Sequence, residues 1–178
     1  MACNITAGRE RACKQGIGGQ STLYLFYQDD TNFMTLSADK STVSAVTLAA
    51  DSVFAFPLEG DSNTLEMSTV GDRNTGTRVN TQTLNVVLPR LDAVTSAQMN
   101  LLVAGYPQAI VADKQGNYIV LGFDHGVDFT VAASTGGSAT DMNGYSLTGI
   151  AMEDGMAPHI DDAAVISDFI DAVDDGVA

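Results

Sequence analysis

Asp124, His125 and Gly126 invite a chemical interpretation, because a histidine can act as a general base. Residues 108–112 and 117–123 are rich in Ile, Val and Tyr, and the intervening segment ends in Gly116, which suits a short hairpin loop. The chain continues at 127–131 with strictly alternating apolar and polar residues, which predicts another strand. We therefore expect His125 in a turn between two strands.

Catalysis would also need a nucleophile or paired acids held in a cleft. The sequence contains no nucleophile elbow and no catalytic signature around His125 or His159. We therefore predict no catalytic residue and expect that the chain is not an enzyme. A hydrolase that uses His125 or His159 with nearby acids is the contrasting hypothesis.

The glycine-rich segment 16–22 resembles a phosphate loop only superficially. A phosphate loop needs a helix behind its glycines, whereas LYLFY at 23–27 predicts a strand, and the lysine of a Walker motif is missing. Residues 141–144 offer two oxygen ligands before a glycine but lack the rest of a calcium loop, so we expect a plain turn. The possible zinc ligands lack paired short spacings: Cys3, Cys13, His125 and His159. We predict no cofactor and no metal site.

The charge of the chain argues against nucleic-acid binding. Eight Lys and Arg oppose 22 Asp and Glu, which gives a formal net charge of -14. Since affinity for nucleic acids comes largely from basic groups that displace counterions, we expect no specific nucleic-acid binding. No apolar run of membrane-spanning length and no signal peptide are recognisable, so we expect no membrane partner and free thiols at Cys3 and Cys13.

The few basic residues are placed unevenly. Three lie in the first fourteen residues and two lie in the polar segment 59–80, whereas residues 153–178 contain eight acids and no Lys or Arg. Such asymmetry can guide head-to-tail contact between identical subunits, and two independently solvated termini are the alternative. The candidate subunit contacts are Arg9, Arg11, Lys14, Arg73 and Arg78.

The pattern of strands predicts a single domain over residues 1–178, mainly β, built as a β-sandwich or barrel. Strands are expected at 21–28, 33–36, 52–58, 80–88, 108–112, 117–123, 127–133 and 145–152. Residues 1–19 are expected to form an N-terminal arm. Residues 59–80 hold few large apolar side chains and predict a long projecting loop or hairpin.

Two helices are expected. One short helix at about 95–105 would be capped by Thr95 and Ser96 and would flank the sandwich. The apolar stripe that it would bury consists of Val94, Ala97, Leu101 and Leu102. The other is an acidic amphipathic helix at 161–174, with apolar residues such as Phe169 at three-to-four spacing. The second helix packs either on its own domain or on a neighbour.

Residues 81–130, TQTLNVVLPRLDAVTSAQMNLLVAGYPQAIVADKQGNYIVLGFDHGVDFT, followed by ATDMNGYSLTGIAMED at 139–154, resemble the tail tube proteins of tailed bacteriophages. The opening CNITAGRERACKQGIGG at 3–19 is also similar to the start of such phage sequences. The resemblance covers about half of the chain and consists of an ordered pattern of strand, short helix, hairpin, strand, glycine loop and strand. The acidic helix at 161–174 departs from the simplest tube proteins.

This resemblance implies hexameric rings that stack into a hollow tube, with inner strands joined across subunits and with DNA only as cargo in transit. Residues 1–19 and 59–80 would reach the next ring. The implied partners are further copies of the chain and other tail proteins such as the tape measure, and the implied location is the virion tail, with assembly in the host cytoplasm. A head decoration protein, a connector or a tail terminator is the alternative, and a small ligand-binding β-sandwich is a further contrasting hypothesis.

Overall fold

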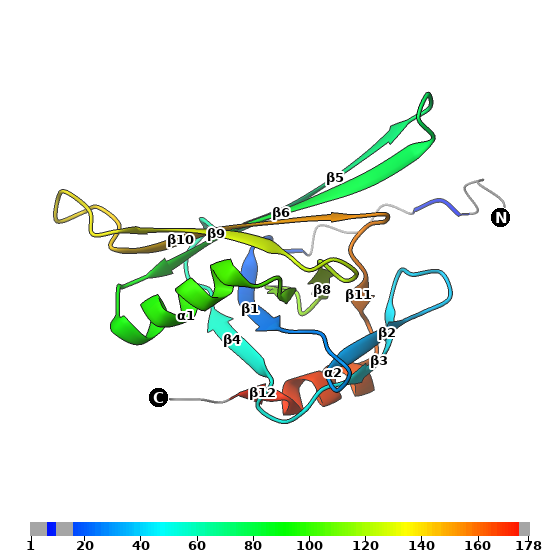
Figure 1. Cartoon of the computed structure of the whole chain (residues 1–178), viewed down its shortest axis with the longest axis horizontal. Helices are drawn as coiled ribbons and strands as arrows, with labels where there is room; N and C mark the ends of the chain where they lie inside the picture. The colour runs from blue at the N-terminus through cyan, green and yellow to red at the C-terminus, as the bar shows by residue number, and fades with distance from the viewer. Residues whose placement is uncertain (1–6, 10–15, 175–178) are drawn as a thin grey trace.

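A computed structural model describes residues 7–9 and 16–174 of the chain. The fold is mainly β and sandwich-like with short helices, which confirms the fold class expected from the sequence (Figure 1). Two sheets pack face to face, and a β-hairpin and a helix cover the outer face of one of them.

A six-stranded sheet forms the centre of the molecule. Its strands, in spatial order, are β11 (His159–Ile160), β8 (Tyr118–Leu121), β7 (Gln108–Asp113), β1 (Gln20–Phe26), β4 (Val53–Pro57) and β12 (Val173–Asp174). The central strand β7 is buried along almost its whole length. Its near-continuous apolar run is explained by this position, because both faces of the sheet are covered.

A four-stranded antiparallel sheet packs on one face of the six-stranded sheet. Its strands, in spatial order, are β5 (Thr64–Asp72), β6 (Thr77–Pro89), β10 (Gly144–Glu153) and β9 (Asp128–Ser134). Buried and more accessible residues alternate along β6 from Asn80 to Leu88. The period of two therefore directs one row of side chains into the sandwich and the other row outward.

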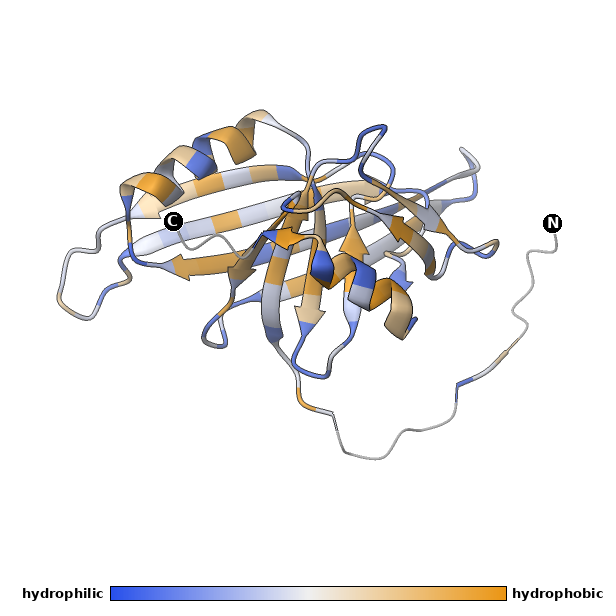
Figure 2. Ribbon diagram, turned by 90° about the horizontal axis from the view of Figure 1, so that it is seen from below, coloured by the Kyte–Doolittle hydropathy of each residue, from blue (hydrophilic) through white to orange (hydrophobic). Residues whose placement is uncertain are grey.

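Two hydrophobic cores hold these layers together. The core between the two sheets contains Leu23, Leu84, Val111, Phe129 and Leu147, all at most 2% exposed. Figure 2 shows the hydrophobic residues concentrated in the strands at the centre, with hydrophilic residues in the connecting loops. Each of these buried side chains contributes roughly 1.5–3 kcal/mol to folding.

The second core lies on the other face of the six-stranded sheet, under the hairpin of β2 (Phe33–Leu36) and β3 (Val43–Thr47) and under α2 (Ala163–Asp171). Phe169 of α2 is fully buried and makes an edge-on contact with Tyr24, with ring centroids 5.0 Å apart. Of the two alternatives for the C-terminal helix, the structure has packing on its own domain. The helix ends at Asp171 rather than at residue 174, because Val173 and Asp174 pair with β4 as β12.

The middle helix, α1 (Ala93–Ala104), differs from expectation in its cap and its buried face. Asp92 caps it, and the Asp92 carboxylate accepts a hydrogen bond from the Thr95 N–H at 2.7 Å. Met99 and Leu102 are buried, whereas Val94 and Leu101 are 61% and 63% exposed. The expected stripe is confirmed at Leu102 and wrong at Val94 and Leu101, because α1 lies along β9 at the rim of the sandwich, where a narrow face meets the core.

Candidate functional site

Both outer strands of the four-stranded sheet have an open edge. Within residues 7–9 and 16–174, β5 pairs only with β6, and β9 pairs only with β10. The Arg90 N–H donates to the Asn143 carbonyl, so these two opposite residues form a hydrogen-bonded pair between the strands β6 and β10. Hydrogen-bonded and non-hydrogen-bonded pairs alternate along antiparallel strands, so this one bond determines which residues of each strand bond to which neighbouring strand. By this alternation, the N–H and C=O groups of residues 129, 131 and 133 in β9, and of 65, 67 and 69 in β5, point away from the sheet. An open edge of this kind is a template for a further strand.

The outward face of the four-stranded sheet is covered by no other element among the described residues. Its side chains are hydroxyls, small aliphatic groups, amides and a few acids, and Val70 and Met152 are the most exposed apolar ones, at 66% and 62%. Side chains along β6 alternate between the two faces of the sheet, and Arg78 falls on the inner face. The face therefore carries no Lys or Arg from these four strands, and its charged residues are Glu66, Asp72 and Asp128.

The hairpin of β5 and β6 projects beyond the sandwich (Figure 1). Of the two forms expected for residues 59–80, the structure has a hairpin, with its tight turn at 73–76 and Gly76 at φ 68°. Arg73 lies exposed in this turn. Because the hairpin emerges from only one end of the sheet, it can reach a neighbour without disturbing the core.

Three of the five candidate subunit contacts lie in the described residues. Arg9 and Arg73 are exposed and are far apart in sequence, and Arg78 is exposed while its Nε donates to the main-chain oxygen of Asp154 at 2.7 Å. Arg11 and Lys14 lie outside the described residues. The structure therefore brings Arg73 and Arg78 together on one hairpin, and one donor of Arg78 is already used within the chain.

The turn at His125 is organised by a buried carboxylate. One oxygen of Glu153, at the end of β10, accepts hydrogen bonds from the N–H groups of Asp124 and His125, each at 3.1 Å. The other oxygen lies 3.1 Å from Nδ1 of His125. The Glu153 side chain is only 6% exposed, whereas the imidazole is exposed. Glu153 thus anchors the crossing from the six-stranded to the four-stranded sheet.

The electrostatics of this turn match a structural role. The hydrogen bond that the imidazole donates to Glu153, followed by the negative charge of Glu153, raises the pKa of His125 above its ordinary value. The only hydrogen-bond partner of the His125 ring among the described residues is Glu153, so no nucleophile is in place there. His159 lies on β11, and its N–H donates to the carbonyl of Ser41. In the described parts of the chain, no three His, Cys, Asp or Glu side chains are grouped as metal ligands.

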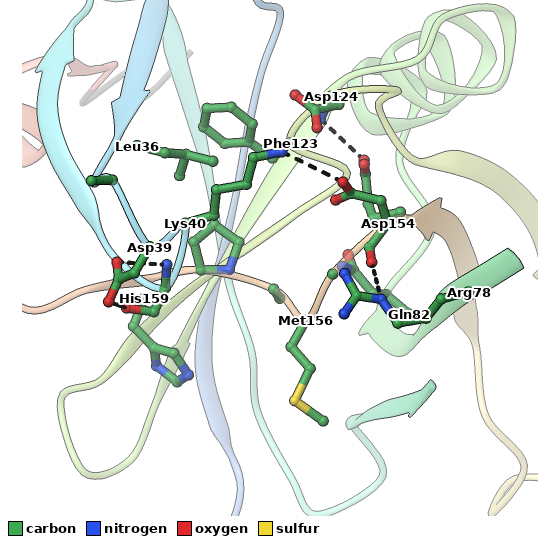
Figure 3. A pocket seen from close by; sticks show the side chains of 16 residues that line it. Leu36, Asp39, Lys40, Arg78, Gln82, Phe123, Asp124, Asp154, Met156 and His159 are labelled. Carbon is green, nitrogen blue, oxygen red and sulfur yellow. Dashed lines mark hydrogen bonds and ion pairs between the residues drawn. The ribbon is translucent and has the colours of Figure 1, made fainter. Parts of the chain in front are cut away.

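A pocket of about 720 Å³ opens between the base of the hairpin, the turn of β2 and β3, and the segment after β10 (Figure 3). Lys40 Nζ lies 3.5 Å from a carboxylate oxygen of Asp154. Arg78 and Gln82 line the same pocket from two inward positions of β6 that are separated by the inward-facing Asn80. The sequence did not reveal this pocket, because its walls come from segments that are far apart along the chain.

A second, apolar groove of about 580 Å³ lies between α1 and strands β1 and β4. Tyr27, Phe54 and Leu101 line it and remain exposed. Asp174 is the charged residue in its lining.

Comparisons with protein-family models, with curated proteins and with solved structures found no match. Neither helix in the described residues has the length and apolar character needed to cross a bilayer. The function is therefore inferred from the sequence and from the geometry of the molecule.

Proposed function

We propose that this chain is a structural subunit that assembles with copies of itself into rings, and that the rings stack to form the tail tube of a bacteriophage. The observation that carries the proposal is the four-stranded sheet with two open edges, β5 and β9. Unpaired edges of this length are normally blunted by lysine or proline in proteins that act alone. Here the strands β5 and β9 contain neither residue.

The direction of the strands is compatible with a closed ring. The sheet has four strands that alternate in direction, so β9 runs antiparallel to the β5 of a copy placed beside it by rotation. Each junction would then continue the antiparallel ladder, using residues such as Ala133 of β9 and Thr69 of β5. The contact is heterologous, because two different edges meet. A closed ring forms when the rotation between neighbouring copies is a whole fraction of a full turn. We take the ring to be hexameric, as the resemblance to tail tube proteins implies.

In such a ring the outward face of the four-stranded sheet lines the channel. Its charged residues are acidic, and hydroxyl groups cover much of the rest. Such a lining offers DNA phosphates no basic group and allows DNA to pass without adhesion. Other tail proteins, such as a tape measure inside the tube, are the further partners in this proposal, and the virion tail is the location.

The hairpin and the N-terminal arm serve the contacts between rings. Arg73 at the tip of the hairpin is exposed, and Arg78 keeps its two terminal nitrogens available beyond the bond of its Nε. Together with Arg9, Arg11 and Lys14, these residues would meet acidic groups of a neighbouring ring. The net charge of -14 reflects an ample supply of such groups on the chain.

The test is a substitution that changes only the open edge. The N–H of Ala133 points away from β10, so Ala133→Pro removes a donor from the edge without removing a bond within the chain. We expect the full-length variant to fold, as judged by circular dichroism, but to lose rings and tubes in negative-stain microscopy and mass photometry. The matched control Ala133→Val keeps the N–H and should assemble like the wild type.

Two results would contradict the proposal. One is a wild-type protein that remains monomeric at high concentration and in the presence of other tail components. The other is Ala133→Pro assembling as well as Ala133→Val. Rings that form but never stack would instead indicate a terminator or connector.

A further inference from the structure

The pocket of Figure 3 contains hydrogen-bond donors that the chain itself does not use. Nε of Arg78 donates to the Asp154 carbonyl, and this bond fixes the direction of the guanidinium group. The two terminal nitrogens of Arg78 have no hydrogen-bond partner among the described residues. They form the planar fork that binds a carboxylate through two parallel bonds.

A buried amide provides a further donor beside this fork. Gln82 is 2% exposed and lines the same pocket. Its Oε1 accepts a hydrogen bond from the Gly122 N–H at 3.1 Å, which fixes the orientation of the amide. Its Nε2 has no partner within residues 7–9 and 16–174. Gln82 and Arg78 lie on the same face of β6, with Asn80 between them, and both line the pocket, so one ligand in the pocket can meet both side chains. Gln82 Nε2 is not one of the fully buried polar atoms that lack a partner in the described residues, so this donor is open to the pocket and can meet an acceptor there.

The acids of the pocket are mostly engaged by other groups. Asp39 accepts hydrogen bonds from Ser37 and Ser41, which lower its pKa. Glu153 holds the turn at His125, and Asp154 pairs with Lys40. Asp124 also lines the pocket, and in Figure 3 Asp154 lies between it and Arg78. The groups left for a ligand near Arg78 are therefore donors.

The rest of the wall is apolar. Leu36, Phe123 and Met156 line the pocket, and Met156 is 66% exposed. An aliphatic group held against these side chains would leave water, which favours binding by about 25 cal/mol for each Å² of apolar surface buried.

We propose that this pocket binds a monocarboxylate attached to an apolar group, with the fork of Arg78 and the Nε2 of Gln82 on the carboxylate and with Phe123 and Met156 on the apolar part. Four acids line the pocket, so a phosphate dianion meets more repulsion than a carboxylate does. The ligand is either a free small carboxylate or the acidic side chain of a second copy. The proposal does not rest on tube assembly.

The test uses pentanoate as the probe and the full-length protein in whatever assembly it forms. Ligand-observed NMR should detect saturable binding of pentanoate, and neither pentylamine nor inorganic phosphate should compete with it. Arg78→Gln should weaken pentanoate binding by roughly tenfold or more, because it removes a bidentate charged contact. Arg73→Gln, on the same hairpin but outside the pocket, should bind pentanoate like the wild type.

Mass photometry with and without pentanoate separates the two sources of carboxylate. If pentanoate binds and the mass of the assembly stays the same, the ligand is a free small molecule. If pentanoate binds and lowers the mass of the wild-type assembly, an acidic side chain of a second copy occupies the pocket. The proposal is overturned if pentanoate does not bind, or if Arg78→Gln binds it no more weakly than Arg73→Gln does.

Discussion

Replacing Glu153 by glutamine tests the anchoring role of the buried carboxylate. In Glu153→Gln the amide oxygen can still accept the N–H groups of Asp124 and His125, but these bonds lose their charge-assisted character. Hydrogen bonds to charged groups contribute about 1 kcal/mol more than neutral ones, so the two bonds together predict a loss of about 2 kcal/mol. With an m-value of about 2 kcal/mol per molar urea, the unfolding midpoint should fall by about 1 M.

The matched control for this substitution is Asp154→Asn. Asp154 is the next residue along the chain, and its exposed carboxylate pairs with Lys40 at 3.5 Å. Because an exposed ion pair contributes about 0–1 kcal/mol, the midpoint of Asp154→Asn should stay close to that of the wild type. Both variants are compared by urea denaturation at one protein concentration, since association would shift the midpoint.

The same substitution has a defined pH dependence. The pKa of His125 is raised in the folded state, mainly by its hydrogen bond to Glu153, so the protonated imidazole stabilises the fold. This contribution is complete below the unfolded pKa of 6.5 and is lost as pH rises through the raised folded value. The difference between the wild type and Glu153→Gln should therefore be larger at about pH 5.5 than at about pH 8.5. Equal midpoints for the two proteins at both pH values would refute the anchoring role.

Two further predictions concern packing and backbone conformation. Phe169→Ala should reduce the free energy of unfolding by about 3–5 kcal/mol in urea denaturation, because Phe169 is fully buried against Tyr24, and a loss below about 1 kcal/mol would contradict that packing. Gly126→Ala should be more destabilising than Gly60→Ala, because both glycines have positive φ but only at Gly126 would a Cβ overlap the carbonyl oxygen of Tyr106. Thermal unfolding compares the two alanine variants, and equal midpoints would contradict this reasoning.

Alternation and turn residues predicted most of the sheet strands. Residues 80–88 lie within β6, and residues 127–133 almost coincide with β9, because each strand has one buried and one accessible face. Strand β3 was not predicted, since it has a single buried residue, Val43, and little alternation. The two-residue strands β11 and β12 were missed because their pairing depends on partners distant in sequence.

The site residues were predicted less completely than the strands. Arg73 and Arg78 stay predicted subunit contacts, chosen for the scarcity and position of basic residues, and the bond of Arg78 to the carbonyl of Asp154 could not be predicted because it depends on tertiary structure. The buried face of α1 was predicted only in part, right at Leu102 and wrong at Val94 and Leu101, because helical periodicity identifies apolar stripes without telling which stripe meets the core. Glu153 was also missed, since a buried glutamate at the end of a strand has no local signal.

The difference in length between the terminal strands of the two sheets limits how copies of this chain can join. The six-stranded sheet ends in β11 and β12, which have two residues each, whereas the four-stranded sheet ends in β5 and β9, with nine and seven residues. An edge strand of two residues offers an added strand too few backbone N–H and C=O groups for stable pairing. In the proposed assembly, strand addition is thereby favoured at the four-stranded sheet over the six-stranded sheet.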